Sequence, residues 1–273
     1  RLLGHKVREW TQARYKYDIL GRIEGDPTTV FILRDYWKKY KARDSKQTKS
    51  ADYAPPMISV EGLAYMYAWP GAGEEAYLPE GQRTAFCIEF HHFISDDNTQ
   101  DSGHSVSNLA ESLKLFGTRH PRIASAHLQS DGAPNYTCSY AAVAVPEISR
   151  YSGVRILSVN HNEPGEGSDL VDADCSHNVR RLNTDIIHHN HRTALDVCKG
   201  LDRDSPVRGG LNRVIDTNRA NDLRKDARKG LKGTKSFLYD EYTYPSSWPA
   251  AGAHVSVTRW NAEEEGVVSV EGI

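Results

Sequence analysis

The order in which strand-like and helix-like segments follow one another constrains this chain more than any other feature of its sequence. Runs rich in β-branched and aromatic residues predict strands, whereas apolar residues spaced three or four apart predict helices. Three strand-like runs come first, and helix-like and strand-like segments alternate after them. The predicted order is strand 28–35, strand 57–69, strand 83–95, helix 105–117, strand 122–132, helix 135–153, strand 153–163 and helix 169–189.

This order predicts a mixed sheet. Three strands in succession favour an antiparallel meander, and strands that alternate with helices favour parallel crossovers. The combination is the one expected of a ribonuclease H-like α/β fold, with a mixed five-stranded sheet flanked by helices. We place this core at residues 28–198, after an N-terminal basic extension at 1–27 and before a C-terminal basic extension with a strand-rich tail at 199–273.

Local signals refine two of the helices. Gly117 is predicted to cap the helix at 105–117, because glycine commonly ends helices. Pro146 is predicted to kink or end the following helix, because proline cannot donate a backbone hydrogen bond.

Composition narrows the class of protein. The 273 residues are 38% hydrophobic and 26% charged, which is enough to bury one sizeable core. No run approaches the roughly 18 apolar residues that a membrane helix needs, so we expect a soluble, intracellular protein. The four cysteines stand far apart without a C-x-x-C pair, which favours free thiols over a zinc ribbon or a disulfide framework.

Charge is unevenly distributed, although its net value is only -2. Residues 1–50 hold thirteen Lys and Arg against six acids, and residues 199–235 hold eleven against five. The rest of the chain is therefore acidic. An acidic centre between basic segments suits a metal-dependent enzyme that acts on a polyanion, although solvated helix faces explain the basic segments equally well.

Three aspartates occupy positions at which chemistry is expected. Asp35 ends the first strand, Asp131 ends the fourth, and Asp172 lies in the first turn of the helix after the fifth. If the first and fourth strands are parallel neighbours, both strand-end acids emerge at one edge of the sheet, and the helix brings the third above them. Several carboxylates converging on two cations are what two-metal phosphoryl transfer requires.

The choice of acids has alternatives. Glu163, Asp169 and Asp174 are close enough in sequence to replace Asp172 as the third carboxylate. Asp52 is an alternative to Asp35, but a long apolar strand delivers Asp35, whereas two prolines follow Asp52.

Other polar residues receive less specific predictions. The histidines at 91–92 and 188–191 could bind zinc, but structural or surface roles are favoured because no cysteine pair completes the ligand set. Loop or capping roles are favoured for Asp96, Asp97 and Asp101, although one of them could support the metal site. The basic residues expected to contact a nucleic-acid backbone are Lys38, Lys39, Arg180 and Arg181.

Several motifs together resemble a lineage of DDE transposases from eukaryotic mobile elements. FISDDNTQDSGHSVSNLAESL is similar to its Ser-Asp-Asp segment before a helix, and IASAHLQSDGAPNYTCS is similar to its strand that ends in Ser-Asp-Gly or Ser-Asp-Asn. VNHNEPGEGSDLVDADCSHNV is similar to its Glu-Pro-Gly-x-Gly-Lys turn, which is followed by an Asp that opens a helix. VFILRDYWKKY and SADYAPPMISVEGLAY resemble its first two strands. The likeness covers roughly residues 30–190 and lies in the order of the motifs.

The resemblance implies a nuclear enzyme that uses two Mg²⁺ or Mn²⁺ ions to cut and rejoin DNA. Asp35, Asp131 and Asp172 match the metal-binding triad, the expected partners are transposon ends and target DNA, and a homo-oligomer is expected. One departure is Ser168, which stands where the family commonly has lysine. The competing hypotheses are a domesticated DNA-binding protein without catalysis and a ribonuclease H-like nuclease that acts on RNA or hybrids.

Overall fold

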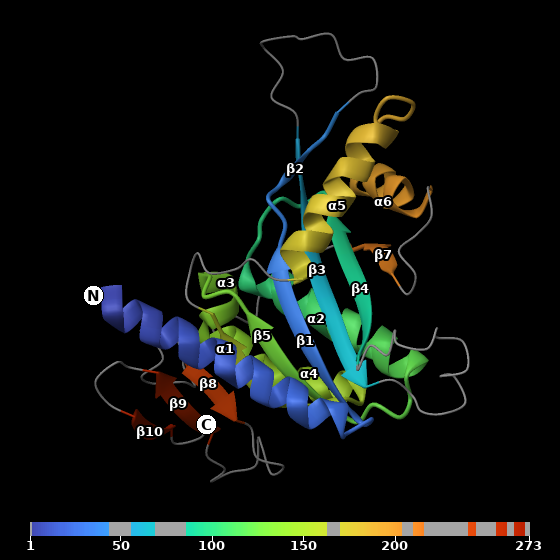
Figure 1. Cartoon of the computed structure of the whole chain (residues 1–273). Helices are drawn as coiled ribbons and strands as arrows, with labels where there is room; N and C mark the ends of the chain where they lie inside the picture. Colours follow the sequence, from blue (N-terminus) through green and yellow to red (C-terminus); the bar gives the residue numbers. More distant parts are fainter. Residues whose placement is uncertain are drawn as a thin grey trace, which may run out of the picture.

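The protein is a mixed sheet with helices packed on both of its faces (Figure 1). The computed structural model describes residues 2–43, 56–68, 86–162, 170–203, 210–215, 240–243, 255–260 and 265–270. The helices are α1 Leu2–Glu24, α2 Ser102–Arg119, α3 Pro134–Thr137, α4 Ser139–Ser152, α5 Leu170–Asp185 and α6 Ala194–Arg203. The strands are β1 Thr29–Tyr36, β2 Tyr40–Lys41, β3 Met57–Ala68, β4 Phe86–Ser95, β5 Ser125–Ser130, β6 Arg155–His161, β7 Leu211–Val214, β8 Asp240–Thr243, β9 Val255–Trp260 and β10 Glu265–Val270.

The centre of the sheet has the strand order β4-β3-β1-β5-β6. β3 is antiparallel to both β1 and β4, whereas β5 is parallel to both β1 and β6. An antiparallel meander followed by parallel crossovers is the ribonuclease H-like arrangement, so the predicted five-stranded mixed core is confirmed. The sheet is larger than predicted, because β7 extends it beyond β4 and β8, β9 and β10 extend it beyond β6.

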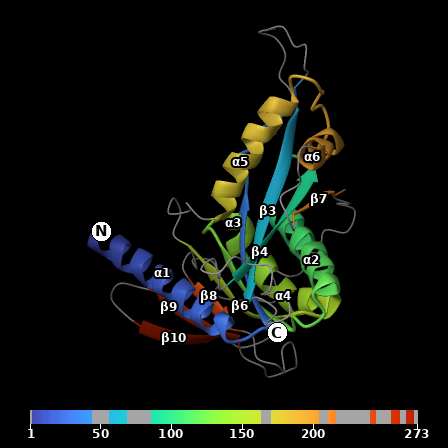
Figure 2. The ribbon, with the colours of Figure 1, turned by 45° about the vertical axis from the view of Figure 1, so that its right-hand side comes forward.

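One face of the sheet is covered by α2 and α4 (Figure 2). Side chains alternate between the two faces along a strand, so Val30 and Ile32 of β1 point to this side. They share a core cluster with residues of the neighbouring strands and of the helices. The buried helical residues in this cluster are Leu109, Leu113, Phe116, Val145 and Ile148.

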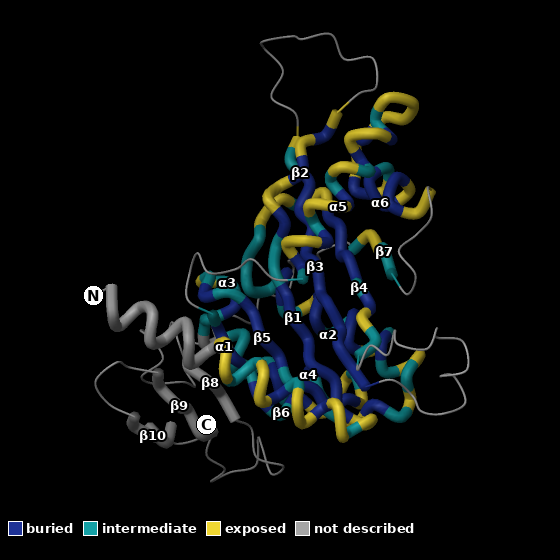
Figure 3. Tube along the Cα trace, in the orientation of Figure 1, coloured by how far each residue is buried: buried dark blue, intermediate teal, exposed yellow. Residues whose placement is uncertain are grey.

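The opposite face is covered by α1 and α5, with α6 beside them. Phe31 and Leu33 of β1 point to this side and pack with Ile19 and Ile23 of α1 and with Val171 of α5. Figure 3 shows β1, β3, β4 and β5 largely buried between the helical layers, whereas α5 and α6 keep an exposed outer side. Most of the stretch at 1–27, predicted as a basic extension, therefore forms the helix α1, of which Ile19 and Ile23 belong to the core.

Two local predictions about helices need correction. α2 continues past Gly117 to Arg119, and a Cβ atom on Gly117 would lie 2.9 Å from Val154 Cγ2, so this glycine permits close packing rather than ending the helix. α4 runs through Pro146 to Ser152, so the predicted helix end at Pro146 is wrong, whereas the predicted kink stays a prediction. Burial of Val145 and Ile148 on either side offsets the hydrogen bond that Pro146 does not donate.

The end of the chain agrees in part with expectation. The tail was predicted to regain strand character, and β8 and β9 confirm this. Part of the stretch at 199–235, predicted as a basic arm, belongs to α6 and β7, and residues 216–239 lie outside the described residues. The four cysteines are free thiols, as predicted. None of the described helices is long and apolar enough to cross a membrane.

Candidate active site

Asp35 and Asp131 lie beside each other at the carboxyl end of the central parallel pair. In the register of β1 and β5, Arg34 pairs with Ser130, and each of these residues is followed directly by one of the two aspartates. Both aspartates are half-buried. The expected meeting of the two strand ends is therefore present in the fold.

The side chain of Asp35 points to the face that α5 covers. Asp35 follows Phe31 and Leu33 at alternate positions along β1, and these two residues pack with Val171 of α5. Across the antiparallel pair Asp35 lies opposite Gly62. A Cβ atom on Gly62 would lie only 2.8 Å from Val171 Cγ1. The first turn of α5 is therefore seated on the sheet at the level of Asp35.

This seating brings Asp172 to the same edge, because it directly follows Val171. Burial, together with the carboxylates of Asp172, Asp174 and Asp35, raises the pKa of the Cys175 thiol to about 12. A single thiol on α5 thus lies within electrostatic reach of acids from the helix and from β1. Asp172 itself is exposed.

Backbone hydrogen bonds orient the two strand-end carboxylates. Oδ1 of Asp35 accepts a bond of 2.7 Å from the Tyr36 amide, and Oδ1 of Asp131 accepts one of 3.1 Å from the Ala133 amide. Carboxylate oxygens are hard donors of the kind that Mg²⁺ and Mn²⁺ prefer. Within the described parts of the chain, however, no three His, Cys, Asp or Glu side chains are close enough together to hold a metal ion. The three aspartates share an edge and do not form a closed cage.

The structure distinguishes between the alternatives for the third metal-binding acid. Asp174 lies on the buried side of α5, where its Oδ2 lies 2.5 Å from His92 Nε2 and its Oδ1 accepts a 3.0 Å bond from Asn178. Its carboxylate is therefore engaged inside the protein, whereas that of Asp172 reaches solvent. Glu163, Asp169 and the alternative first acid Asp52 lie outside the described residues.

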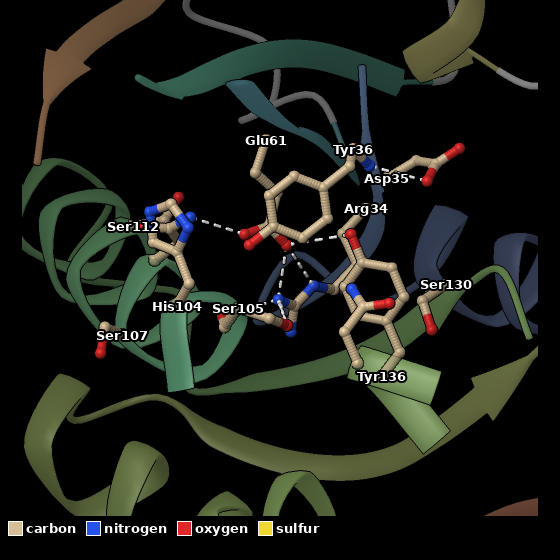
Figure 4. A network of polar contacts seen from close by, with 12 residues as sticks. Arg34, Asp35, Tyr36, Glu61, His104, Ser105, Ser107, Ser112, Ser130 and Tyr136 are labelled. Atoms are coloured by element: carbon tan, nitrogen blue, oxygen red, sulfur yellow. Dashed lines mark hydrogen bonds and ion pairs between the residues drawn. The ribbon is translucent and has the colours of Figure 1, made fainter. Parts of the chain in front are cut away.

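A buried ion pair next to the acidic edge was not anticipated from the sequence (Figure 4). The Arg34 guanidinium donates to Glu61 Oε1 from Nε at 3.0 Å and from Nη2 at 2.5 Å, and both side chains are almost fully buried. Asn108 donates to the other carboxylate oxygen at 2.7 Å, and the Tyr136 hydroxyl donates to Oε1 at 3.2 Å. Burial opposes the charge of Arg34, but the Glu61 carboxylate outweighs it and the pKa of Arg34 is raised.

This network is a structural support for the site. Arg34 immediately precedes Asp35, yet alternation along β1 sends the two side chains to opposite faces, and Figure 4 shows the Asp35 carboxylate directed away from the ion pair. Tyr136 belongs to α3, which follows the turn at Asp131. The ion pair thus ties the end of β1 and the middle of β3 to α2 and to the segment after Asp131. The sequence signal was a lone glutamate within the otherwise apolar centre of β3.

The histidines considered for zinc have structural partners. His92 contacts Asp174 through one ring nitrogen and Asn212 of β7 through the other, at 2.7 Å. His191 lies 2.8 Å from the Tyr40 hydroxyl and 2.7 Å from the Asp185 carboxylate. These contacts agree with the structural roles favoured for the histidines.

The three loop acids also behave as expected. Asp101 caps α2 by accepting from the His104 amide at 3.0 Å, and Asp97 accepts from the Thr99 amide at 2.9 Å. Asp96 accepts a 2.7 Å bond from the Ala194 amide at the start of α6. Each of them shapes a turn or a helix end, as expected for capping residues.

The four predicted basic contacts differ in their surroundings. Lys38 and Lys39 are exposed in the bend between β1 and β2, and Trp37 beside them is buried. Arg180 is exposed on α5. Arg181 is half-buried and donates to Asn178 Oδ1 at 3.2 Å and to the Leu201 carbonyl at 3.0 Å, so its guanidinium joins α5 to α6.

Comparison with known proteins adds little to the assignment of a fold or a function. Neither a protein-family model nor a curated protein sequence matches the chain. Among solved structures, a similar one is the Mn-soaked, inhibitor-bound nuclease domain of the human cytomegalovirus terminase. It is 14% identical, the alignment covers 80% of this chain and 83% of that domain, and the TM-score is 0.29. The description of the fold therefore rests on the strand order itself.

Proposed function

We propose that this protein is a divalent-metal-dependent DNA nuclease of the transposase type. The observation that carries the proposal is the register of β1 and β5, which sets Asp35 and Asp131 side by side, with the first turn of α5 and Asp172 seated against the same edge. Two-metal phosphoryl transfer needs carboxylates fixed around both ions, and two strand ends with a helix turn beside them can supply these on rigid elements.

Asp35, Asp131 and Asp172 would hold the metal, which we expect to be two Mg²⁺ or Mn²⁺ ions. When bound, the ions would activate the attacking oxygen and stabilise the leaving one. The protein's own part is to fix carboxylates on rigid elements and to supply cations for phosphate. Backbone amides orient Asp35 and Asp131, and the exposed Lys38 and Lys39 follow Asp35 closely along the chain.

The transposase assignment is the finer part of the proposal and is supported by the order of motifs along the sequence. It predicts that the substrate is DNA, both at the ends of a mobile element and at a target, and that cleavage is followed by strand transfer. It also predicts action in the nucleus and assembly into a homo-oligomer.

The first test is nicking of supercoiled duplex DNA by the purified chain in Mg²⁺ or Mn²⁺. Asp131→Asn removes one carboxylate charge and is expected to abolish nicking. Glu147→Gln is the matched control, because Glu147 is an exposed acid on α4, which covers the opposite face of the sheet. Loss of nicking in both variants, or in neither, contradicts the assigned role of Asp131. A preference for RNA–DNA hybrid over duplex DNA would identify a ribonuclease H-like nuclease instead.

A second candidate is a transposase-derived DNA-binding protein without catalysis. The observation favouring it is that the described residues hold no cluster of three metal-ligating side chains as they stand. Ser168 at the position of the family's lysine points the same way. Tight DNA binding that does not change on addition of Mg²⁺, with no nicking by the folded protein, is the result that this candidate predicts.

A further inference from the structure

α5 carries a continuous exposed stripe that begins at the candidate active site. Residues of an α-helix advance by about 100° each, so Asp172, Ser176, Arg180 and Asn183 fall within a sector of about 80°. All four residues are exposed. The buried side of the helix holds Asp174, Asn178 and Leu182, well away from this sector. The stripe therefore leads along the solvent side of α5, away from Asp172.

A second element lies against the far end of this stripe. The exposed Arg43, just beyond β2, exchanges backbone hydrogen bonds of 2.8 Å with His191, which follows α5 in the chain. The Arg43 guanidinium donates from Nη1 to Asn183 Oδ1 at 3.3 Å. Figure 1 shows β2 running beside the end of α5, where the two extend beyond the rest of the sheet. Arg43 thus adds a second cation to the surface that Arg180 occupies.

The accessible charge of this region is cationic. Along α5 from Ala173 to Thr184, and in the described strand exit from Trp37 to Arg43, the only carboxylate is that of Asp174, and it is buried. The charged groups that remain accessible are arginines and lysines. A surface of this kind attracts a polyanion, and the small polar residues beside the arginines can bond to phosphate oxygens.

We propose that Ser176, Arg180, Asn183 and Arg43, here called the α5 track, bind the sugar–phosphate backbone of DNA on one side of the scissile phosphate. This inference rests on the proposed function, because it takes the edge at Asp172 as the place of cleavage. From Asp172 to Asn183 the helix rises about 17 Å. At about 3.4 Å per nucleotide of one strand, the track spans about five nucleotides of one strand of the duplex.

The track is tested by binding, so that the result does not depend on catalysis. The full chain carrying Asp131→Asn is titrated with a fluorescein-labelled 30-base-pair duplex over a range of NaCl concentrations. Adding Arg43→Ala and Arg180→Ala is expected to weaken binding roughly tenfold at low salt and to reduce the slope of log Kd against log salt by about two, because each phosphate contact contributes about 0.9. An affinity and a slope equal to those of the unsubstituted track overturn the proposal.

A charge-matched control separates the track from the protein's net charge. Lys114 of α2 and Arg150 of α4 are exposed cations on the helices that cover the other face of the sheet. Replacing both with alanine removes the same charge and is expected to change the salt slope by far less. An equal change in the control pair would mean that the effect is one of net charge, and would also overturn the proposal.

Substrate length distinguishes failure of the track from failure of the proposed function. In the nicking assay with Asp131 intact, duplexes are shortened stepwise on either side of the cut. The nicking rate of the Arg43→Ala, Arg180→Ala variant is expected to be lower than that of the unsubstituted track on long duplexes. This difference in rate is expected to vanish once fewer than about five nucleotides remain on one side of the cut. A disadvantage independent of length contradicts the track. No nicking of any substrate, with the binding difference intact, rejects the nuclease while leaving the track in place.

Discussion

Gly62 and Val171 meet so closely that a Cβ atom on the glycine would lie 2.8 Å from Val171 Cγ1. The contact joins the centre of β3 to the first turn of α5, one residue before Asp172. Gly62 also lies opposite Asp35 in the sheet. The missing side chain is therefore what allows the helix to bring its acid down to the strand that carries the other.

The first prediction concerns this contact. Gly62→Ala places a methyl group against Val171 and 3.1 Å from Trp37 Nε1, so α5 must move outward. We expect a loss of about 1–3 kcal/mol in the free energy of unfolding, as for other overpacked cores. Nicking activity should fall further than stability explains, because Asp172 moves with the helix. Urea unfolding and the nicking assay measure the two effects.

Two variants control for simple destabilisation. Gly117→Ala creates a comparable contact with Val154 at 2.9 Å, away from the acidic edge, and should leave nicking unchanged per folded molecule. Adding Val171→Ala to Gly62→Ala makes room for the new methyl group and should restore part of the activity. Failure of this double variant to recover would show that the helix position is not what Gly62 controls.

The second prediction distinguishes Asp172 from Asp174. Asp172 is exposed, so Asp172→Asn should abolish nicking while changing the free energy of unfolding by less than about 0.5 kcal/mol. Asp174 is buried against His92, so Asp174→Leu should cost about 3–5 kcal/mol, as expected when one partner of a buried polar pair is removed. Thermal unfolding followed beside the nicking assay gives both readings. The reverse pattern would make Asp174 the metal ligand and Asp172 a surface residue.

The strand order was predictable because it rests on local signals. The sequences of buried strands such as β1 and β3 are long runs rich in β-branched and aromatic residues. The sheet edge that Asp35 and Asp131 share follows from the parallel pairing of their strands alone. β7 could not be found in this way. Its four residues, LNRV, pair with β4 through backbone hydrogen bonds, and their side chains form no pattern that predicts a strand.

The choice between Asp172 and Asp174 illustrates what sequence leaves open. Both lie in the first two turns of α5, and the side of the helix that faces the sheet depends on where Val171 meets Gly62. That contact joins residues more than a hundred positions apart. The Arg34–Glu61 pair was missed for the same reason, since a buried charge is interpretable only when its partner on another strand is known.

The third prediction concerns this buried pair. Glu61→Gln leaves the Arg34 cation without its counter-charge in the interior and should cost about 3–5 kcal/mol in the free energy of unfolding. Replacing both residues, as Arg34→Met with Glu61→Leu, removes the uncompensated charge and should recover most of that loss. Guanidinium unfolding of Arg34→Met, of Glu61→Leu and of the double variant closes the cycle. Additive losses would mean that the two charges do not interact.

The fourth prediction is a fall in stability at mildly acidic pH. Burial lowers the pKa of His91, and also that of His127 and of His161, to about 4, from an ordinary value of 6.5. Because the folded-state pKa lies below the unfolded one, the unfolded chain binds the proton more readily between these two values. Stability from these histidines is thus complete above pH 6.5 and is lost as the pH falls towards 4.

His91 isolates one contribution to this pH dependence. It is fully buried, with Nδ1 2.8 Å from the Ser112 hydroxyl, and an asparagine amide can occupy the place of Nδ1. His91→Asn should therefore remove about 2 kcal/mol of the difference in stability between pH 7.5 and pH 5. Urea unfolding at the two pH values measures the difference, and His188→Asn, at an exposed position after α5, is the control. An unchanged difference in His91→Asn would mean that this ring takes up its proton without unfolding the protein.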